Sequence, residues 1–383
     1  MSKSKIIFTT GLAMFAMFFG SGNLVFPLRL GVESGDNYLI SSIGFIITGV
    51  AMPFVGLFSV MLYKGDKNKY FGLLGKWEPF VLSMILLLLM GPFGVAPRCI
   101  IVAYGGINAL YSDISLVWFS LFFSLVILLI IWGQNNIVPI IGKLLGPIKI
   151  STIIIIIIAC IISAPEFTAK SAQINPFLDG IFEGYQTMDL PAAFFFSITI
   201  VQYLNRVVKN KDEVLEISLA SGVVGATLIA SIYLCFAMLG AHYSENLRDL
   251  RPEDYLAAMA QISLGKNAAL IFALTMFLAC LTTAATLCRL FAEFLCHDIG
   301  KGRIPWGVAS VVTVGVTFIL SLTGFSTITT ILGIMLTYIY PALVVLAISS
   351  LFSKYAGFRY TRHAFWATII IAVLVERAVD IQA

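Results

Sequence analysis

Charged side chains are scarce in this chain: Asp, Glu, Lys and Arg make up 11% of its 383 residues, whereas hydrophobic residues make up 59%. Soluble domains usually carry about 25% charged residues. Apolar runs of about 20 residues recur along the whole length, and one such run crosses a bilayer as a helix. The scarcity of charge therefore excludes an ordinary soluble domain and predicts an all-α polytopic membrane protein.

The chain also lacks the side-chain clusters on which enzymes and metal sites depend. Its six cysteines lie inside apolar segments without CxxC spacing, so neither a disulfide framework nor a metal site is expected. The three histidines stand at segment ends, and no Ser/His/Asp constellation is visible. The net charge of +4 is spread over short loops without a basic block. We therefore expect no enzyme, no cofactor and no nucleic-acid partner.

What the chain does contain is a series of apolar segments that predicts about eleven spanning helices. If the N-terminus is cytoplasmic, sixteen of the 24 Lys and Arg residues fall in inner segments and four in outer loops. This asymmetry follows the positive-inside rule and supports both the count and an inner N-terminus. The expected spans are 5–31, 38–63, 78–110, 115–133, 148–164, 188–207, 215–241, 267–296, 304–322, 326–351 and 363–381.

The middle of the first span is interrupted by Gly20-Ser21-Gly22-Asn23, with Pro27 close behind. Each interior glycine costs a helix about 1 kcal/mol relative to alanine. Broken helices at membrane depth survive only around protein or water, and they form the substrate and ion sites of secondary transporters. The alternative is a small-residue surface on which two helices pack. We favour a break, because its helix end would attract a carboxylate and its free carbonyls a cation.

Two later spans carry polar groups with two possible uses. The adjacent Thr282 and Thr283 either bond back to carbonyls one turn earlier, or Thr283 offers its hydroxyl to Na⁺. The sixth span has no clean glycine break, and its phenylalanines either pack in the ordinary way or wall an apolar pocket. The candidate pocket residues there are Phe194, Phe195, Phe196, Ser197, Ile198 and Thr199.

Ionisable residues inside spans form a third set of candidates. Arg98 follows a stretch rich in glycine and proline, residues 91–97, deep in the third span. An arginine within the membrane faces the bundle interior or water and is a functional candidate by default. Arg289 and Glu293 are four residues apart, so we expect a structural or gating ion pair between them.

Three motifs in chain order resemble the branched-chain amino acid carrier family, the leucine/isoleucine/valine:cation symporters of bacteria. They are residues 18–27, Gly91-Pro92 with Pro97-Arg98, and residues 279–283. The resemblance runs through nearly the whole chain and implies membership of the amino acid–polyamine–cation superfamily. The chain departs from the family pattern at Cys99 and Gly105, where the family carries Thr and Glu.

The resemblance implies a leucine-transporter-type fold, in which five helices are followed by five more of inverted topology. The first repeat would occupy residues 1–164, the second residues 188–351, and an extra C-terminal helix residues 363–383. The first and sixth spans would be the broken pair, and the third and eighth the long, tilted pair.

The resemblance also implies where ligands bind. The substrate carboxylate would meet the amides of Ser21, Gly22 and Asn23, beside Gly20. We expect the ammonium to meet sixth-span carbonyls near Phe196–Thr199, and Phe194 or Phe195 to cover the apolar side chain. The implied sodium ligands are the carbonyls of Ala16, Phe19, Ala279 and Thr282 and the hydroxyl of Thr283.

The expected function is therefore sodium symport of leucine, isoleucine and valine into the cell, across a bacterial cytoplasmic (inner) membrane. An apolar pocket separates substrates that differ by one methylene by only ~1–3 kcal/mol, so all three should be carried. One alternative keeps the fold but couples a small neutral amino acid to protons. Another is a non-transporting membrane receptor or scaffold, against which the broken first helix argues.

Overall fold

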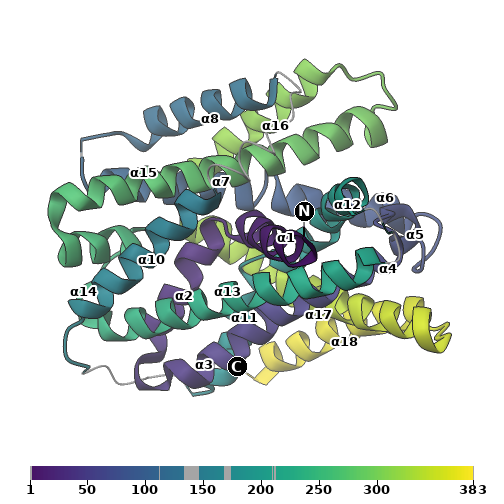
Figure 1. The fold of residues 1–383 in the computed structure, drawn as a ribbon, viewed down its shortest axis with the longest axis horizontal. Helices are drawn as coiled ribbons and strands as arrows, with labels where there is room; N and C mark the ends of the chain where they lie inside the picture. Colours follow the sequence, from purple (N-terminus) through teal and green to yellow (C-terminus); the bar gives the residue numbers. More distant parts are fainter. Residues whose placement is uncertain are drawn as a thin grey trace.

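The computed structural model describes residues 2–111, 113–132, 146–167, 174–208, 210 and 213–382. Within these ranges every regular element is a helix (Figure 1). The α-helices are α1 (Lys3–Phe18), α2 (Ser21–Ser34), α3 (Tyr38–Ile46), α4 (Met52–Leu62), α5 (Lys67–Phe71), α6 (Glu78–Met90), α7 (Val95–Asn108), α8 (Leu116–Trp132), α10 (Gly146–Ile162), α11 (Pro176–Tyr185), α12 (Asp189–Val207), α13 (Val214–His242), α14 (Ser244–Leu247), α15 (Tyr255–Phe294), α16 (Trp306–Ser321), α17 (Phe325–Ala356) and α18 (Thr361–Gln382).

The helices are long and apolar enough for a multi-pass membrane protein. Five helical segments in the described chain can cross a membrane by length and composition, and the bent pair α11 and α12 makes a sixth. Three shorter apolar helices accompany them, at residues 116–132, 149–162 and 306–321. The all-helical prediction is confirmed, and each expected span coincides with a helix or a pair of helices. The sixth begins earlier than expected, because α11 precedes α12 and the expected span 188–207 covers α12 alone.

The long third and eighth spans are less regular than expected. The third is divided into α6 and α7 by a turn at Gly91–Gly94, which contains Pro92. The eighth is the 40-residue α15, which begins at Tyr255 and has a kink at Gly265, where φ is +74°. A positive φ suits glycine best. Gly265 therefore separates the N-terminal segment of α15, which begins at Tyr255, from the rest of the helix.

The packing of the spans is reciprocal. The second span (α3 and α4) lies against the sixth (α11 and α12), and the seventh (α13) lies against the first (α1 and α2). The third and eighth spans pack directly, through α7 and α15. An inverted repeat exchanges spans one and six and spans two and seven, so these are the pairings that such a fold produces. The residue bounds of the two repeats stay a prediction.

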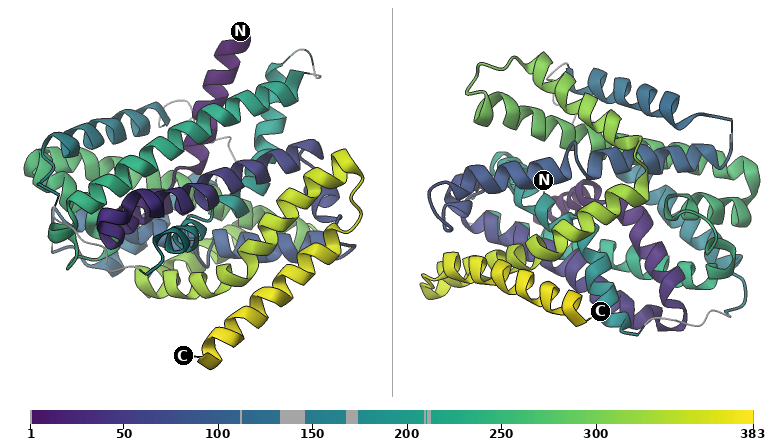
Figure 2. Two further views of the ribbon diagram at one scale, coloured as in Figure 1. Left: turned by 90° about the horizontal axis from the view of Figure 1, so that it is seen from below. Right: turned by 180° about the vertical axis from the view of Figure 1, so that it is seen from behind.

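Helices α5, α14 and α18 lie at the periphery of the molecule, whereas the two helix breaks lie in its interior. Figure 1 shows α5 and α14 at opposite ends of the long axis. The C-terminal α18 packs on α17 at the edge of the bundle, away from the first span (Figure 2). The two helix breaks lie in the interior, where the first, sixth and eighth spans meet.

Candidate functional site

The predicted break of the first span is confirmed. α1 ends at Phe18, α2 begins at Ser21, and Gly20 between them is extended, with φ −119° and ψ −158°. The Asn23 side chain turns back, and its Oδ1 accepts a hydrogen bond from the Gly20 amide at 2.8 Å. The first amides of a helix have no acceptor within the helix. The start of α2 at Ser21 and Gly22 therefore offers N–H groups that suit a carboxylate.

The sixth span is also broken, as the resemblance implies, but not by glycine. α11 and α12 meet at a bend of 44° across Gln186–Met188. Met188 lies in the left-handed region, with φ +58° and ψ +22°, which costs a non-glycine residue of order 1–3 kcal/mol. The Thr187 hydroxyl stabilises the turn, because it donates to the Gly184 carbonyl at 2.9 Å and accepts from the Asp189 amide at 3.3 Å.

This position corrects one expectation. Free carbonyls were expected near Phe196–Thr199, whereas these residues lie inside the unbroken α12, where the helical hydrogen bonds occupy the carbonyls. The backbone opens ten residues earlier than Phe196, at Gln186. The unpaired backbone groups of the sixth span therefore lie at the junction of α11 and α12 and not within α12.

A polar junction links the two breaks. The Asn23 amide donates to Asp189 Oδ2 at 2.7 Å and also contacts the Tyr233 hydroxyl, which donates to the same oxygen at 3.0 Å. Asp189 is buried, and within the described chain no Lys or Arg lies within ion-pair distance of it. A buried carboxylate without a cationic partner is costly. Its neighbours are neutral donors, so the junction suits an incoming ammonium group.

A small cavity lies beside this junction. Both breaks line it, through Gly20–Asn23 and Thr187–Asp189, and Thr283 of the eighth span completes one side. Its volume of about 20 Å³ accommodates roughly one water molecule. The structure is therefore a closed form, in which this cavity is too small for an amino acid.

Only one of the three candidate phenylalanines faces the cavity. Phe196 lines it and packs edge-on against Phe18, with ring centroids 5.4 Å apart. Phe194 and Phe195 instead contact Phe71 of α5, at 5.8 and 6.3 Å. Phe194 and Phe195, the phenylalanines expected to cover the substrate side chain, therefore do not line this cavity, whereas Phe196 does.

The other sixth-span candidates also lie away from the cavity. Ser197 is buried but donates to the Phe194 carbonyl at 2.8 Å, within its own helix. Ile198 is half-buried, and Thr199 is exposed. None of the three lines the cavity.

The eighth-span threonines lie opposite the first break. A Cβ atom on Gly20 would lie 3.3 Å from Thr283 Oγ1, so the two spans approach closely there. Both hydroxyls bond back to the Ala279 carbonyl, Thr282 at 2.9 Å and Thr283 at 3.1 Å. The structure thus brings together the spans that carry the predicted sodium ligands, and it also shows the helical bonds of the alternative interpretation.

A lysine that the sequence analysis placed among the inner-loop charges lies at this point. Lys149 of α10 is only 4% exposed, and its Nζ donates to the Phe19 carbonyl at 2.9 Å. Phe19, at the end of α1, was expected to offer this carbonyl to sodium. Lys149 and Asp189 stand at the edges of apolar runs, where a charge is usually assigned to the membrane surface, so the sequence alone gave no signal for their burial.

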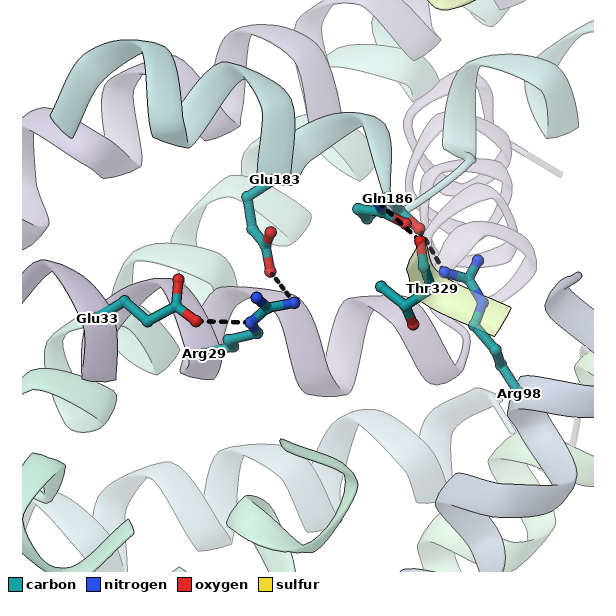
Figure 3. A network of polar contacts seen from close by, with 6 residues as sticks. All are labelled: Arg29, Glu33, Arg98, Glu183, Gln186 and Thr329. Carbon is teal, nitrogen blue, oxygen red and sulfur yellow. Dashed lines mark hydrogen bonds and ion pairs between the residues drawn. The ribbon is translucent and has the colours of Figure 1, made fainter. Parts of the chain in front are cut away.

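Arg98 supports the second break. It is fully buried on α7, and its Nη1 donates to the Gln186 carbonyl at 3.0 Å (Figure 3). Its guanidinium also lies 5.3 Å from the ring of Phe26, a distance typical of a cation–π contact. Gln186 in turn donates to the Thr329 carbonyl of α17 at 3.4 Å. Arg98 is thus a positioning residue that satisfies a carbonyl freed at the end of α11.

A second arginine joins the two broken spans. Arg29 of α2 contacts Glu33 at 2.7 Å on its own helix and Glu183 of α11 at 3.7 Å (Figure 3). The Arg29–Glu183 pair therefore lies across the contact between the two broken spans.

The pair expected on the eighth span also forms. Arg289 Nε and Glu293 Oε1 are 2.9 Å apart, and both side chains are partly exposed. A gating role for this pair stays a prediction, as an exposed i,i+4 pair contributes only about 0.3–0.5 kcal/mol.

Known sequences similar to this chain are described as branched-chain amino acid transporters. Residues 3–381 match the sequence profile of a family described as "Branched-chain amino acid transport protein". The chain is 29% identical over 358 residues to the branched-chain amino acid permease BrnQ of Corynebacterium glutamicum, covering 92% of this chain and 82% of the permease. It is 30% identical over 317 residues to BrnQ of Bacillus subtilis, covering 79% and 72%.

Two solved structures of similar fold are more distant in sequence. The nucleobase-cation-symport-1 transporter Mhp1, closed with bromovinylhydantoin bound, superposes with a TM-score of 0.65 at 13% identity, covering 96% of this chain and 90% of Mhp1. MhsT in complex with L-phenylalanine gives a TM-score of 0.62 at 13% identity, covering 96% and 97%. At these identities the likeness concerns the fold, which is of the leucine-transporter type.

Proposed function

This chain belongs to the branched-chain amino acid transport protein family, and from that premise we propose that it is a secondary active transporter that imports leucine, isoleucine and valine. The observation that carries the proposal is the meeting of two broken helices at a buried carboxylate. One break offers helix amides and the other offers Asp189, and an amino acid carries the two complementary charges.

The recognition step follows from this arrangement. The substrate carboxylate binds the amides at the start of α2, at Ser21–Asn23, and the ammonium binds Asp189 beside Tyr233. Leaving either charge unpaired at membrane depth would cost several kcal/mol, so both ends of the molecule have to be satisfied. Phe196 and Phe18 cover the branched side chain.

Transport requires that this site opens alternately to the two sides. The closed cavity of about 20 Å³ is too small for leucine, so binding has to separate α1 and α2 from α11 and α12. The Arg29–Glu183 pair closes part of that contact. This ion pair acts as a gate: it is formed in the closed state and broken in the open state, and substrate binding shifts the equilibrium between the two states.

The coupling ion is not part of this proposal, because two observations favour different ions. Sodium symport is supported by Thr283, whose hydroxyl lies opposite Gly20 at the first break. The alternative is a carrier that does not use sodium, such as a proton-coupled one. The observation in its favour is Lys149, whose ammonium holds the Phe19 carbonyl that sodium would need.

We further propose a bacterial cytoplasmic membrane and a cytoplasmic N-terminus, on the distribution of Lys and Arg. Removing the buried Lys149 from the inner set leaves fifteen residues inside against four outside. Cysteines introduced at Lys69, on α5, and at Arg248, next to α14, test this orientation, because both positions are exposed. An impermeant thiol reagent should label position 248 and not position 69 in intact cells; the reverse pattern overturns the orientation.

Uptake of labelled leucine into proteoliposomes tests the function. We expect uptake that saturates and is inhibited by unlabelled isoleucine and valine. A folded protein that accumulates none of the three, with either a sodium or a proton gradient, would contradict a branched-chain carrier.

A further inference from the structure

The contact between Lys149 and the first break joins two parts of the chain that are 130 residues apart. Phe19 follows the last residue of α1, and its carbonyl faces the gap between α1 and α2, where no helical amide continues the ladder. Lys149 Nζ donates to this oxygen at 2.9 Å. The lysine is 4% exposed, so its ammonium is committed to the interior and does not reach water at a helix end.

The ammonium occupies the neighbourhood in which a sodium ion is expected. The expected ligands come from the end of α1 and from the Ala279–Thr283 turn of α15, and α10 packs against both helices. Gly20, next to Phe19, lies against Thr283. Lys149 therefore enters the gap from a third helix and takes one of the carbonyls that the ion would require.

The surroundings of Lys149 do not offer the negative charge that would balance both its ammonium and a sodium ion. Within the described residues no carboxylate lies within ion-pair distance of its Nζ. The titratable groups near it are the thiols of Cys99 on α7 and Cys280 on α15. The α13 groups nearest the breaks, above all Tyr233, are engaged with Asp189 and Asn23. The lysines of α1 lie at its N-terminal end, whereas Phe19 follows its C-terminal end. Two positive charges in one small, buried site repel strongly, because the interior screens them poorly.

The hydrogen bonds of Thr282 and Thr283 on α15 are consistent with a site in which the Lys149 ammonium takes the place of sodium. The Thr282 and Thr283 hydroxyls both direct their protons to the Ala279 carbonyl, the bonding that Ser and Thr adopt in any helix. This carbonyl, too, is an expected sodium ligand, and it already accepts two hydroxyl donors.

We propose that the ammonium of Lys149 is the built-in cation of this site, that it replaces the sodium ion expected between α1 and α15, and that substrate binding needs no sodium there. Lys149 acts by holding the Phe19 carbonyl and the adjacent break, so it is a positioning residue. The transport consequence rests on the proposed function, whereas the ion-binding consequence holds for any substrate of this fold.

The ion-binding consequence is tested without an amino acid. Thermal unfolding of the purified protein is measured in NaCl and in choline chloride at equal ionic strength. A ligand that binds only the folded state raises the melting temperature. We expect no sodium-specific shift for the wild type, and a sodium-specific rise of several degrees for Lys149→Met and Lys149→Gln, in which the expected ligands become available to the ion.

The two variants separate charge from hydrogen bonding. Lys149→Gln retains a donor for the Phe19 carbonyl and Lys149→Met retains none, so an equal response to sodium assigns the effect to the charge. Lys5→Met is the matched control, because it removes an exposed positive charge from α1, the helix that ends beside Phe19. Its melting temperature should show no sodium-specific rise. Sodium-specific stabilisation of the wild type overturns the inference, and this result does not depend on whether the variants fold.

The transport consequence has its own readout. In proteoliposomes, leucine uptake by the wild type should differ by less than about twofold between sodium and choline media, and uptake by Lys149→Met should rise at least about fivefold on adding sodium. Wild-type uptake that needs sodium overturns the inference and leaves the proposed function intact. Absence of leucine uptake in every medium counts against the proposed function, and the melting experiment then still decides the role of Lys149.

Discussion

The two helix breaks at the centre of this protein are built by different chemistry. The first uses Gly20, with Asn23 capping the helix that follows. The second contains no glycine; it turns on Met188 in a left-handed conformation and is stabilised by Thr187 and by the buried Arg98. The first break is thus formed by residues of its own segment, whereas the second also depends on a hydrogen bond from Arg98 of α7.

The difference matches the roles that we assign to the two breaks. The first offers main-chain amides, which a carboxylate can approach closely because Gly22 has no side chain. The second offers Asp189, a full charge whose position depends on Asn23 and Tyr233 from two other helices. Substrate recognition therefore draws on backbone at one break and on a positioned side chain at the other.

The largest expected effect comes from closing the first break. A Cβ atom on Gly22 would lie 3.3 Å from the Cα of Thr187, so the two breaks already touch at this residue. Gly22→Leu should lower leucine affinity by at least about 100-fold, roughly 2.7 kcal/mol, because the side chain fills the space between the breaks. Equilibrium binding of labelled leucine to the purified protein measures it.

Gly315→Leu is the matched control for that substitution. Gly315 lies on α16, and nothing lies within 4 Å of a Cβ built there. It should bind leucine like the wild type. If folded Gly22→Leu also binds leucine with near-native affinity, Gly22 is only a packing residue and the backbone-amide site is lost.

A smaller effect should come from the aromatic side of the cavity. Phe195 and Phe196 are both 5% exposed, so replacing either with alanine removes a similar amount of buried ring. Only Phe196 lines the cavity. Phe196→Ala should weaken leucine relative to alanine as a competitor by about tenfold, roughly 1.4 kcal/mol. Phe195→Ala should lower the melting temperature comparably but keep the selectivity; the opposite pattern would restore Phe195 to the site.

The smallest effect should come from the hydroxyl that stabilises the second break. Thr187→Val keeps the shape of the side chain but removes both of its hydrogen bonds. A net loss of about 1 kcal/mol is expected, because a bond such as that to the Gly184 carbonyl contributes about 0.5–1.5 kcal/mol and the 3.3 Å bond from the Asp189 amide is long and weak. Melting temperature and leucine affinity should both fall modestly. Complete loss of binding with unchanged melting would instead make Thr187 a direct ligand.

The same contrast explains what could be predicted from the sequence. Glycines in an apolar run mark the first break directly, and the lengths of the runs predict the spans. The second break carries no local mark, because Thr187 and Met188 are ordinary residues whose geometry is imposed by α7 and α11. The family resemblance predicted that the sixth span is broken, but it did not predict that the break lies at residues 186–188.

The charges of the site were missed for a related reason. Asp189 and Lys149 each lie at the edge of an apolar run, and such residues usually face the membrane surface. Here α12 begins in the interior because α11 precedes it, and the lysine side chain reaches the gap beside Phe19. Burial of a charge depends on tertiary packing, which a single sequence does not contain.

The central claim is that one break binds the carboxylate of the substrate and the other binds its ammonium. Competition with labelled leucine by unlabelled leucine and by 4-methylpentanoate, which lacks the ammonium, tests this claim in the wild type and in Asp189→Asn. We predict that the wild type prefers leucine by about 100-fold or more, roughly 2.7 kcal/mol, and that Asp189→Asn reduces the preference to about tenfold or less, roughly 1.4 kcal/mol. An undiminished preference in folded Asp189→Asn would contradict the account, because the ammonium would then be bound elsewhere.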